Sequence, residues 1–230
     1  MRLTQEGDAV MATGGKALLD RRRAGVLFMF GSVLFLLLTT ASESIYPNFS
    51  LQTNAVSDLA AVGTSTTIIE ETAILGLGVC WTLGAYYLFR NTGRSKKMGL
   101  YVLPGVGFLL AGLSPENVNI VIHSIGAPFA FGFGAVSALM SYRIIRSQFR
   151  YFSIALGALS LASTLVIFIG GQLVGPCGSC AGNVPGYTQR LEELGLGLGG
   201  WESMIIYPLL IWLIGFGSYL LASSDLREEA

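Results

Sequence analysis

Four ionisable side chains have the types and positions that a polar binding site would need. They are three carboxylates and the only histidine of the 230-residue chain: Asp58, Glu70, Glu202 and His123. His123 lies about five residues inside a long apolar stretch, which is roughly 8 Å along a helix. An ionisable group at such a depth in a membrane protein normally faces the bundle interior or a cavity. The pattern predicts an outward-facing polar pocket that binds a lipid headgroup or a small ligand.

The same residues allow other interpretations. The carboxylates can be interface charges in contact with water, with His123 as a hydrogen-bonded structural residue. Alternatively, Glu202 or Asp58 could pair with His123 as general acid and base in a lipid-modifying reaction. No nucleophile motif accompanies that pair, so no catalytic residue is assigned and enzymatic activity is the less favoured expectation. A third interpretation is a structural subunit of a membrane protein complex, or a homo-oligomer.

The residue counts limit metal and cofactor chemistry. One histidine excludes a zinc site built on three histidines and a haem held by two axial histidines. A mixed site of His, Glu and Asp is arithmetically possible but has no local spacing motif. We therefore predict no metal and no cofactor.

Two of the three cysteines form the motif Cys177-Gly-Ser-Cys180 in the last long polar segment. Such a motif can be a redox pair, half of a zinc site or a local disulfide. Three cysteines are too few for a four-cysteine zinc site, and no second pair exists to relay electrons. Because the outer face of a membrane is usually oxidising, we favour a disulfide between Cys177 and Cys180.

The elements that must position these residues are six stretches without Asp, Glu, Lys or Arg. They cover residues 24–42, 72–89, 98–113, 118–142, 151–172 and 203–223. As a helix, about 20 apolar residues span a bilayer core of roughly 30 Å. The stretches are apolar on all sides, whereas a helix buried on one side would carry a polar stripe. The sequence therefore predicts an all-α fold, an integral membrane bundle of six transmembrane helices over residues 24–223, with polar tails at 1–23 and 224–230.

The basic residues set the predicted orientation. The expected cytoplasmic segments are 1–23, 90–97, 143–150 and 224–230. These segments hold every Lys and Arg except Arg190, as the positive-inside rule requires. The short stretch 98–113, which contains Pro104, must cross as well, because otherwise the basic segment 143–150 would lie outside. Both termini are thus predicted to be cytoplasmic.

The overall composition fits a membrane protein and excludes some other classes. The chain is 52% hydrophobic and 12% charged with no net charge, whereas soluble domains carry roughly 25% charged residues. A strongly basic nucleic-acid binder and a disordered polyelectrolyte are therefore excluded. The expected partners are membrane lipids.

Three motifs resemble one family. They read Tyr46-Pro47-x-x-Ser50-x-x-x-Asn54-Ala-Val-Ser57-Asp58-Leu59, Ile122-His123-x-x-x-Ala127 and Gly200-Trp-Glu202-x-x-x-x-Tyr207-Pro208-x-x-x-Trp212. The chain is similar, from the first apolar stretch onward, to the multi-pass membrane family called domain of unknown function 998, found in archaea and bacteria. It is more loosely similar in layout to the Frag1/DRAM/Sfk1 group, some of which are linked to lipid or membrane-trafficking roles. The resemblance implies six helices, a prokaryotic plasma membrane and matched positions at Asp58, His123 and Glu202, and it supplies no established reaction.

Overall fold

The computed structural model describes residues 2–90, 95–173 and 191–228, and the described part of the chain is helical without strands. The long helices are α1 (Arg2–Ile45), α2 (Thr67–Phe89), α3 (Ser95–Leu113), α4 (Ile120–Met140), α5 (Phe149–Leu173) and α7 (Leu198–Glu228). Two short 3₁₀ helices, η1 (Ser57–Ala60) and η2 (Ser141–Arg143), lie in the connections. The prediction of an all-α fold is confirmed.

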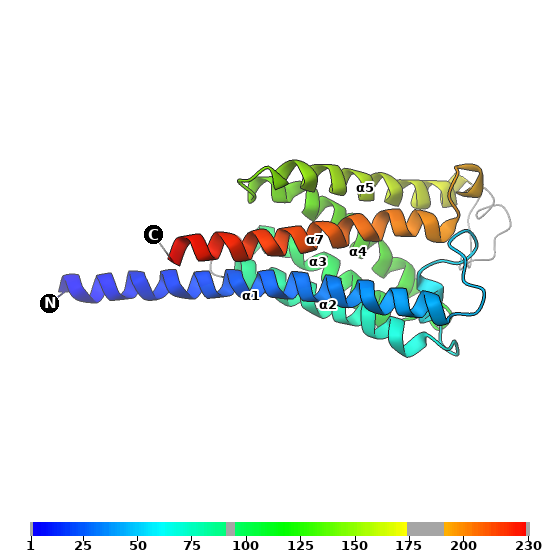
Figure 1. Cartoon of the computed structure of the whole chain (residues 1–230), viewed down its shortest axis with the longest axis horizontal. Coiled ribbons are helices and arrows are strands. Elements are labelled where there is room, and N and C mark those ends of the chain that lie inside the picture. Colours follow the sequence, from blue (N-terminus) through cyan, green and yellow to red (C-terminus); the bar gives the residue numbers. More distant parts are fainter. Residues whose placement is uncertain (1, 91–94, 174–190, 229–230) are drawn as a thin grey trace.

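The long helices form a closed ring in chain order. Each helix packs against its neighbours in the sequence, and α7 closes the ring by packing against both α5 and α1. Both chain ends point to the same end of the bundle, which we call the terminal end (Figure 1). The opposite end, called the loop end, carries residues 46–66, 114–119 and 191–197. This up-and-down arrangement brings residues that are distant in the sequence together at each end.

The helices agree with the predicted apolar stretches. Five of the helices are long and apolar enough to cross a membrane, by length and composition, and the apolar part of α3, Met98–Leu113, is shorter. Five of the six predicted stretches lie wholly inside helices, and 118–142 extends two residues beyond each end of α4. A sixth crossing and the orientation of the termini stay predictions.

The first helix is longer than its apolar stretch. α1 begins at Arg2 and continues without a break through the residues predicted as a polar tail. No proline occurs before Pro47, so the sequence contains no residue that must interrupt the helix there. α7 likewise continues past residue 223 to Glu228.

Aromatic side chains fill the centre of the bundle. Trp81 of α2 lies 5.9 Å from Trp212 of α7 and 5.9 Å from Phe108 of α3, measured between ring centroids. Trp212 stacks on Phe216 at 5.4 Å. These rings tie α2, α3 and α7 together, and the side chain of Phe108 also reaches toward the loop end.

An ion pair joins α1 and α2 at the terminal end. The Arg90 guanidinium donates to both carboxylate oxygens of Asp20, at 2.6 Å from Nε and 2.5 Å from a terminal nitrogen. Asp20 is 1% exposed, and the same guanidinium lies 4.8 Å from the ring centroid of Tyr87. A bidentate pair of this kind stabilises the contact and also fixes the relative position of the two helices. The pair holds the end of α2 against α1 where the basic residues gather.

Candidate functional site

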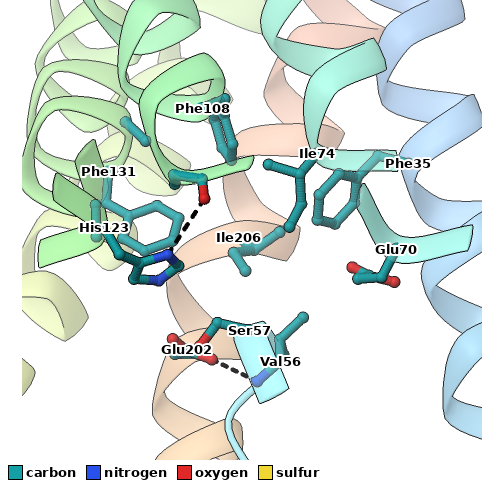
Figure 2. Close-up of a pocket in the computed structure, with 13 residues that line it drawn as sticks. Phe35, Val56, Ser57, Glu70, Ile74, Phe108, His123, Phe131, Glu202 and Ile206 are labelled. Carbon is teal, nitrogen blue, oxygen red and sulfur yellow. Dashed lines mark hydrogen bonds between the residues drawn. The ribbon is translucent and has the colours of Figure 1, made fainter. Parts of the chain in front are cut away.

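Three of the four predicted site residues line a single cavity at the loop end. Glu70 comes from α2, His123 from α4 and Glu202 from α7 (Figure 2). The cavity has a volume of about 40 Å³, and a water molecule needs roughly 10–15 Å³ by the same measure. It therefore has room for a small polar group or a few water molecules.

The wall of the cavity is mostly apolar. Phe35, Phe108 and Phe131 form part of it, and Val56 and Ser57 of the α1–α2 loop (residues 46–66) contribute from the loop end. Figure 2 shows Phe131 beside His123, Phe35 on the side of Glu70, and the Val56–Ser57 backbone close to Glu202. An apolar wall with a few convergent polar groups is typical of small-ligand sites.

Glu70 is a carboxylate of the described structure with a buried oxygen that makes no hydrogen bond of ordinary geometry. Its side chain is fully buried, at 0% exposure. One oxygen accepts a hydrogen bond of 2.9 Å from the Thr39 hydroxyl of α1. The other oxygen makes no hydrogen bond of ordinary length and angle among the described residues, and the Ser42 hydroxyl of α1, which also lacks such a bond, interacts with the same carboxylate. Burial of a carboxylate oxygen without a donor is costly, so this oxygen is a ready acceptor.

His123 is held by the end of the preceding helix. Its Nδ1 lies 3.3 Å from the carbonyl oxygen of Ala111 and 3.2 Å from that of Ser114. The last carbonyls of a helix lack partners within it, and here the imidazole supplies one. Because carbonyl oxygens only accept, Nδ1 carries the hydrogen, and in the neutral ring Nε2 carries a lone pair.

Glu202 fixes the α1–α2 loop over the cavity. Its Oε2 accepts a hydrogen bond of 2.5 Å from the backbone N–H of Val56, across 146 residues of sequence. Nearby, the backbone N–H of Gly200 donates to the Leu51 carbonyl at 2.9 Å. Asn117, between α3 and α4, makes two hydrogen bonds of 3.0 Å with the backbone of Val62. The loop is therefore attached to α7 and to the α3–α4 turn.

Asp58 lies beside the cavity and organises the loop. Its carboxylate accepts from the backbone N–H of Ala55 at 2.9 Å and from the Asn54 amide at 3.4 Å. It also hydrogen-bonds the carboxyl group of Glu116, whose other contact is the Ser57 hydroxyl at 3.2 Å. Two carboxyl groups can share a hydrogen bond only when one is protonated. Burial, followed by this hydrogen bond and the negative charge of Asp58, raises the pKa of Glu116 to about 8.

Some contributors to the site could not be assigned from the sequence. Thr39 belongs to a run of small residues, Thr39-Thr40-Ala41-Ser42, at the end of the first apolar stretch. Nothing in that run pointed to Glu70. The backbone N–H of Val56 and the wall of phenylalanines carry no signal in the sequence, because their roles depend on how the helices pack.

Other predicted features are not found at the cavity. Cys177 and Cys180 lie outside the described residues, so their disulfide stays a prediction. Within the described ranges, no group of three or more His, Cys, Asp or Glu residues is arranged to hold a metal ion. The cavity is thus built around hydrogen-bond acceptors contributed by separate helices.

Replacing Glu202 with alanine is expected to loosen the α1–α2 loop. The substitution leaves the N–H of Val56 without its acceptor, and Val56 is buried. A buried donor left unpaired costs about 1–3 kcal/mol. Hydrogen exchange of the Val56 amide should become faster. In the matched control, Glu193→Ala, an exposed carboxylate at the same end is removed, and the exchange rate should not change. Equal protection of Val56 in the two variants would contradict this role for Glu202.

Comparison with known protein families identifies the family of the chain. A family model described as "Protein of unknown function (DUF998)" matches residues 29–219, which confirms the resemblance inferred from the motifs. The similarity to the Frag1/DRAM/Sfk1 group stays a prediction. No curated protein and no solved structure matches the chain.

Proposed function

Because the chain belongs to the DUF998 family of proteins of unknown function, we propose a function from the cavity itself. The protein is an integral membrane protein that binds a lipid headgroup or a small polar ligand between its helices. The site lies at the loop end, which faces outward. The observation that carries this proposal is the convergence of Glu70, His123 and Glu202, from three helices, on one cavity.

A membrane location with six crossings is supported by the packing of α3. This helix contains the shortest apolar segment, yet it packs between α2 and α4 in the closed ring. Both α2 and α4 are long enough to cross a membrane. Because α3 packs against both of them, we expect α3 to lie in the membrane as well. The charge pattern favours a cytoplasmic terminal end, because every Lys and Arg except Arg190 falls in the segments assigned to that side. Because the family occurs in archaea and bacteria, we place the protein in a prokaryotic plasma membrane.

A buried polar atom without a hydrogen bond favours ligand binding over a purely structural role for the site. A histidine that only stabilises the fold needs no open face, and Glu70 would be expected to find donors for both oxygens. Instead one oxygen of the buried Glu70 carboxylate accepts from Thr39, and the other makes no hydrogen bond of ordinary geometry in the described structure. Such a group is retained at a cost in stability, which is typical of functional positions.

The enzymatic alternative has less support. The general acid–base pair of that alternative needs Glu202 or Asp58 within hydrogen-bond reach of His123. In the described structure the hydrogen bonds of His123 run from Nδ1 to the carbonyl oxygens of Ala111 and Ser114, and those of the two carboxylates run to the loop. The carboxylate–histidine pair required for that reaction is therefore not formed.

Native mass spectrometry of the protein released from its own membranes tests the proposal. Wild-type protein should carry a defined extra mass that is lost in His123→Ala, because the substitution removes a polar side chain that lines the cavity. The control is Ser124→Ala, an exposed neighbour on the same helix that does not line the cavity, and it should keep the extra mass. Identical spectra without an extra mass in all three proteins would contradict binding and favour a structural subunit of a complex.

A further inference from the structure

We propose that the cavity recognises a protonated amine, with its ammonium group placed between Glu70, Glu202 and His123. This inference rests on the binding function proposed above and specifies the chemistry of the ligand. An alkylammonium group can come from the headgroup of an aminophospholipid or from a free amine. Both sources present the same –CH₂–NH₃⁺ group to the cavity.

The polar groups of the cavity are arranged to accept hydrogen bonds. Glu70 presents a buried carboxylate oxygen that makes no hydrogen bond of ordinary geometry, and Glu202 presents a carboxylate that accepts from the backbone of Val56 and Ser57. His123 uses Nδ1 as the donor to backbone carbonyls, so the neutral ring offers Nε2 as an acceptor. The hydroxyl of Ser57, the remaining polar side chain of the wall, donates to Glu116. A ligand that fits this set must bring several donors, and an ammonium group has three.

The charge at the loop end has the sign that a cationic ligand requires. Eight carboxylates belong to this end in the sequence: Glu43, Asp58, Glu70, Glu71, Glu116, Glu192, Glu193 and Glu202. The only basic residue assigned to this end is Arg190, which lies outside the described residues. In a low-dielectric interior, carboxylates are stabilised by a nearby cation. An anionic phosphate would be repelled by the same groups.

The size and the wall of the cavity select a small cation. A volume of about 40 Å³ holds an ammonium group and its first methylene more readily than a phosphate with its oxygens. Phe35, Phe108 and Phe131 form part of the wall, and aromatic faces attract cations. The same rings provide an apolar surface for the methylene groups next to the nitrogen. Thus acceptors, charge and wall all favour an alkylammonium group.

The test uses the full-length protein in nanodiscs and a charge-removing variant of Glu70. Wild-type protein is placed in phosphatidylglycerol nanodiscs and titrated with ethanolamine; in a second arm the nanodiscs contain phosphatidylethanolamine. Native mass spectrometry reads out bound ethanolamine or retained lipid. In Glu70→Gln, affinity should fall about ten-fold or more, since a charge-assisted hydrogen bond is lost. Glutamine keeps an oxygen that can accept from Thr39, so the variant preserves the contact that holds this side chain.

The control is Glu71→Gln, the same substitution one position later on α2, at a residue that does not line the cavity. It should bind like wild type. Retained phosphatidylethanolamine without ethanolamine binding assigns the amine to a lipid, and binding of ethanolamine assigns it to a free ligand; both outcomes support the inference. Two results would overturn the inference. One is retention of phosphatidylglycerol equal to that of phosphatidylethanolamine, and the other is equal affinity of Glu70→Gln and Glu71→Gln for the amine. If either result is obtained but wild-type protein still carries a bound mass that His123→Ala lacks, the proposed binding function is retained and only the assignment of the ligand as an amine is rejected.

Discussion

Gly107→Ala is expected to destabilise the bundle by about 3 kcal/mol or more, at the upper end of the cost of overpacking a core. Gly107 of α3 faces α4 at a close crossing of the two backbones. A Cβ atom on Gly107 would lie 2.7 Å from the carbonyl oxygen of Gly126 and would overlap the backbone nitrogen of Ala130. Ordinary contacts between non-bonded atoms are about 3.5–4.0 Å. The neighbours are backbone atoms, so α3 and α4 must move apart.

This separation is also expected to disturb the cavity. Phe108 and Ala111 of α3, and Ala127 and Ala130 of α4, line it on either side of the crossing. The backbone carbonyl of Ala111 also holds His123. A shift between the helices would therefore move the imidazole relative to Glu70 and Glu202. We expect Gly107→Ala to lose the extra mass seen in native mass spectrometry as well as stability.

Thermal unfolding in mild detergent measures the first effect, with an expected fall in Tm of roughly 6–12 °C. The matched control is Gly132→Ala on α4, where a Cβ atom would meet nothing within 4 Å. Its stability should stay within about 1 kcal/mol of wild type, because alanine replaces glycine in an open helical position. A Gly107→Ala protein as stable as Gly132→Ala would show that the α3–α4 crossing is not close in the membrane.

Glu116→Gln is expected to remove a pH dependence of stability between about pH 4.5 and pH 8. The pKa of Glu116 is raised from an ordinary value of 4.5 to about 8 by burial, by its hydrogen bond to Asp58 and by the charges of Asp58 and Glu202. The folded protein thus binds this proton more tightly than the unfolded chain. The resulting stabilisation is fully present below pH 4.5 and is lost as the pH rises through 8.

Glutamine resembles the protonated acid and can still donate to Asp58. The variant should match wild type near pH 4.5 and be more stable at pH 9, by about 2 kcal/mol after allowance for partial exposure to water. Denaturation at a series of pH values measures the difference. Glu193→Gln, at an exposed site on the same end, should follow the wild-type curve. Parallel curves for wild type and Glu116→Gln would exclude the shared proton between Glu116 and Asp58.

The sequence by itself determined the fold class and the candidate residues. A stretch that is apolar on every side can satisfy its backbone inside a membrane only as a helix or in a closed barrel, so the helical reading did not depend on contacts between distant residues. The motifs around Asp58, His123 and Glu202 identified the family because residue types at fixed spacing are a property of the chain alone. Glu70, His123 and Glu202 were identified because an ionisable group next to or inside an apolar stretch is costly and therefore informative.

Only the tertiary structure decided how these groups meet. α7 closes the ring against α1 and α5, and this closure carries Glu202 to the N–H of Val56. Close backbone contact at Gly107 and Gly126 sets the distance between α3 and α4, and with it the position of His123. Asp58 turned out to hold the loop and to face Glu116 instead of lining the cavity. Such outcomes depend on packing between residues far apart in the sequence, such as Val56 and Glu202, which are 146 positions apart. The spacing of residues within one helix carries no record of that packing.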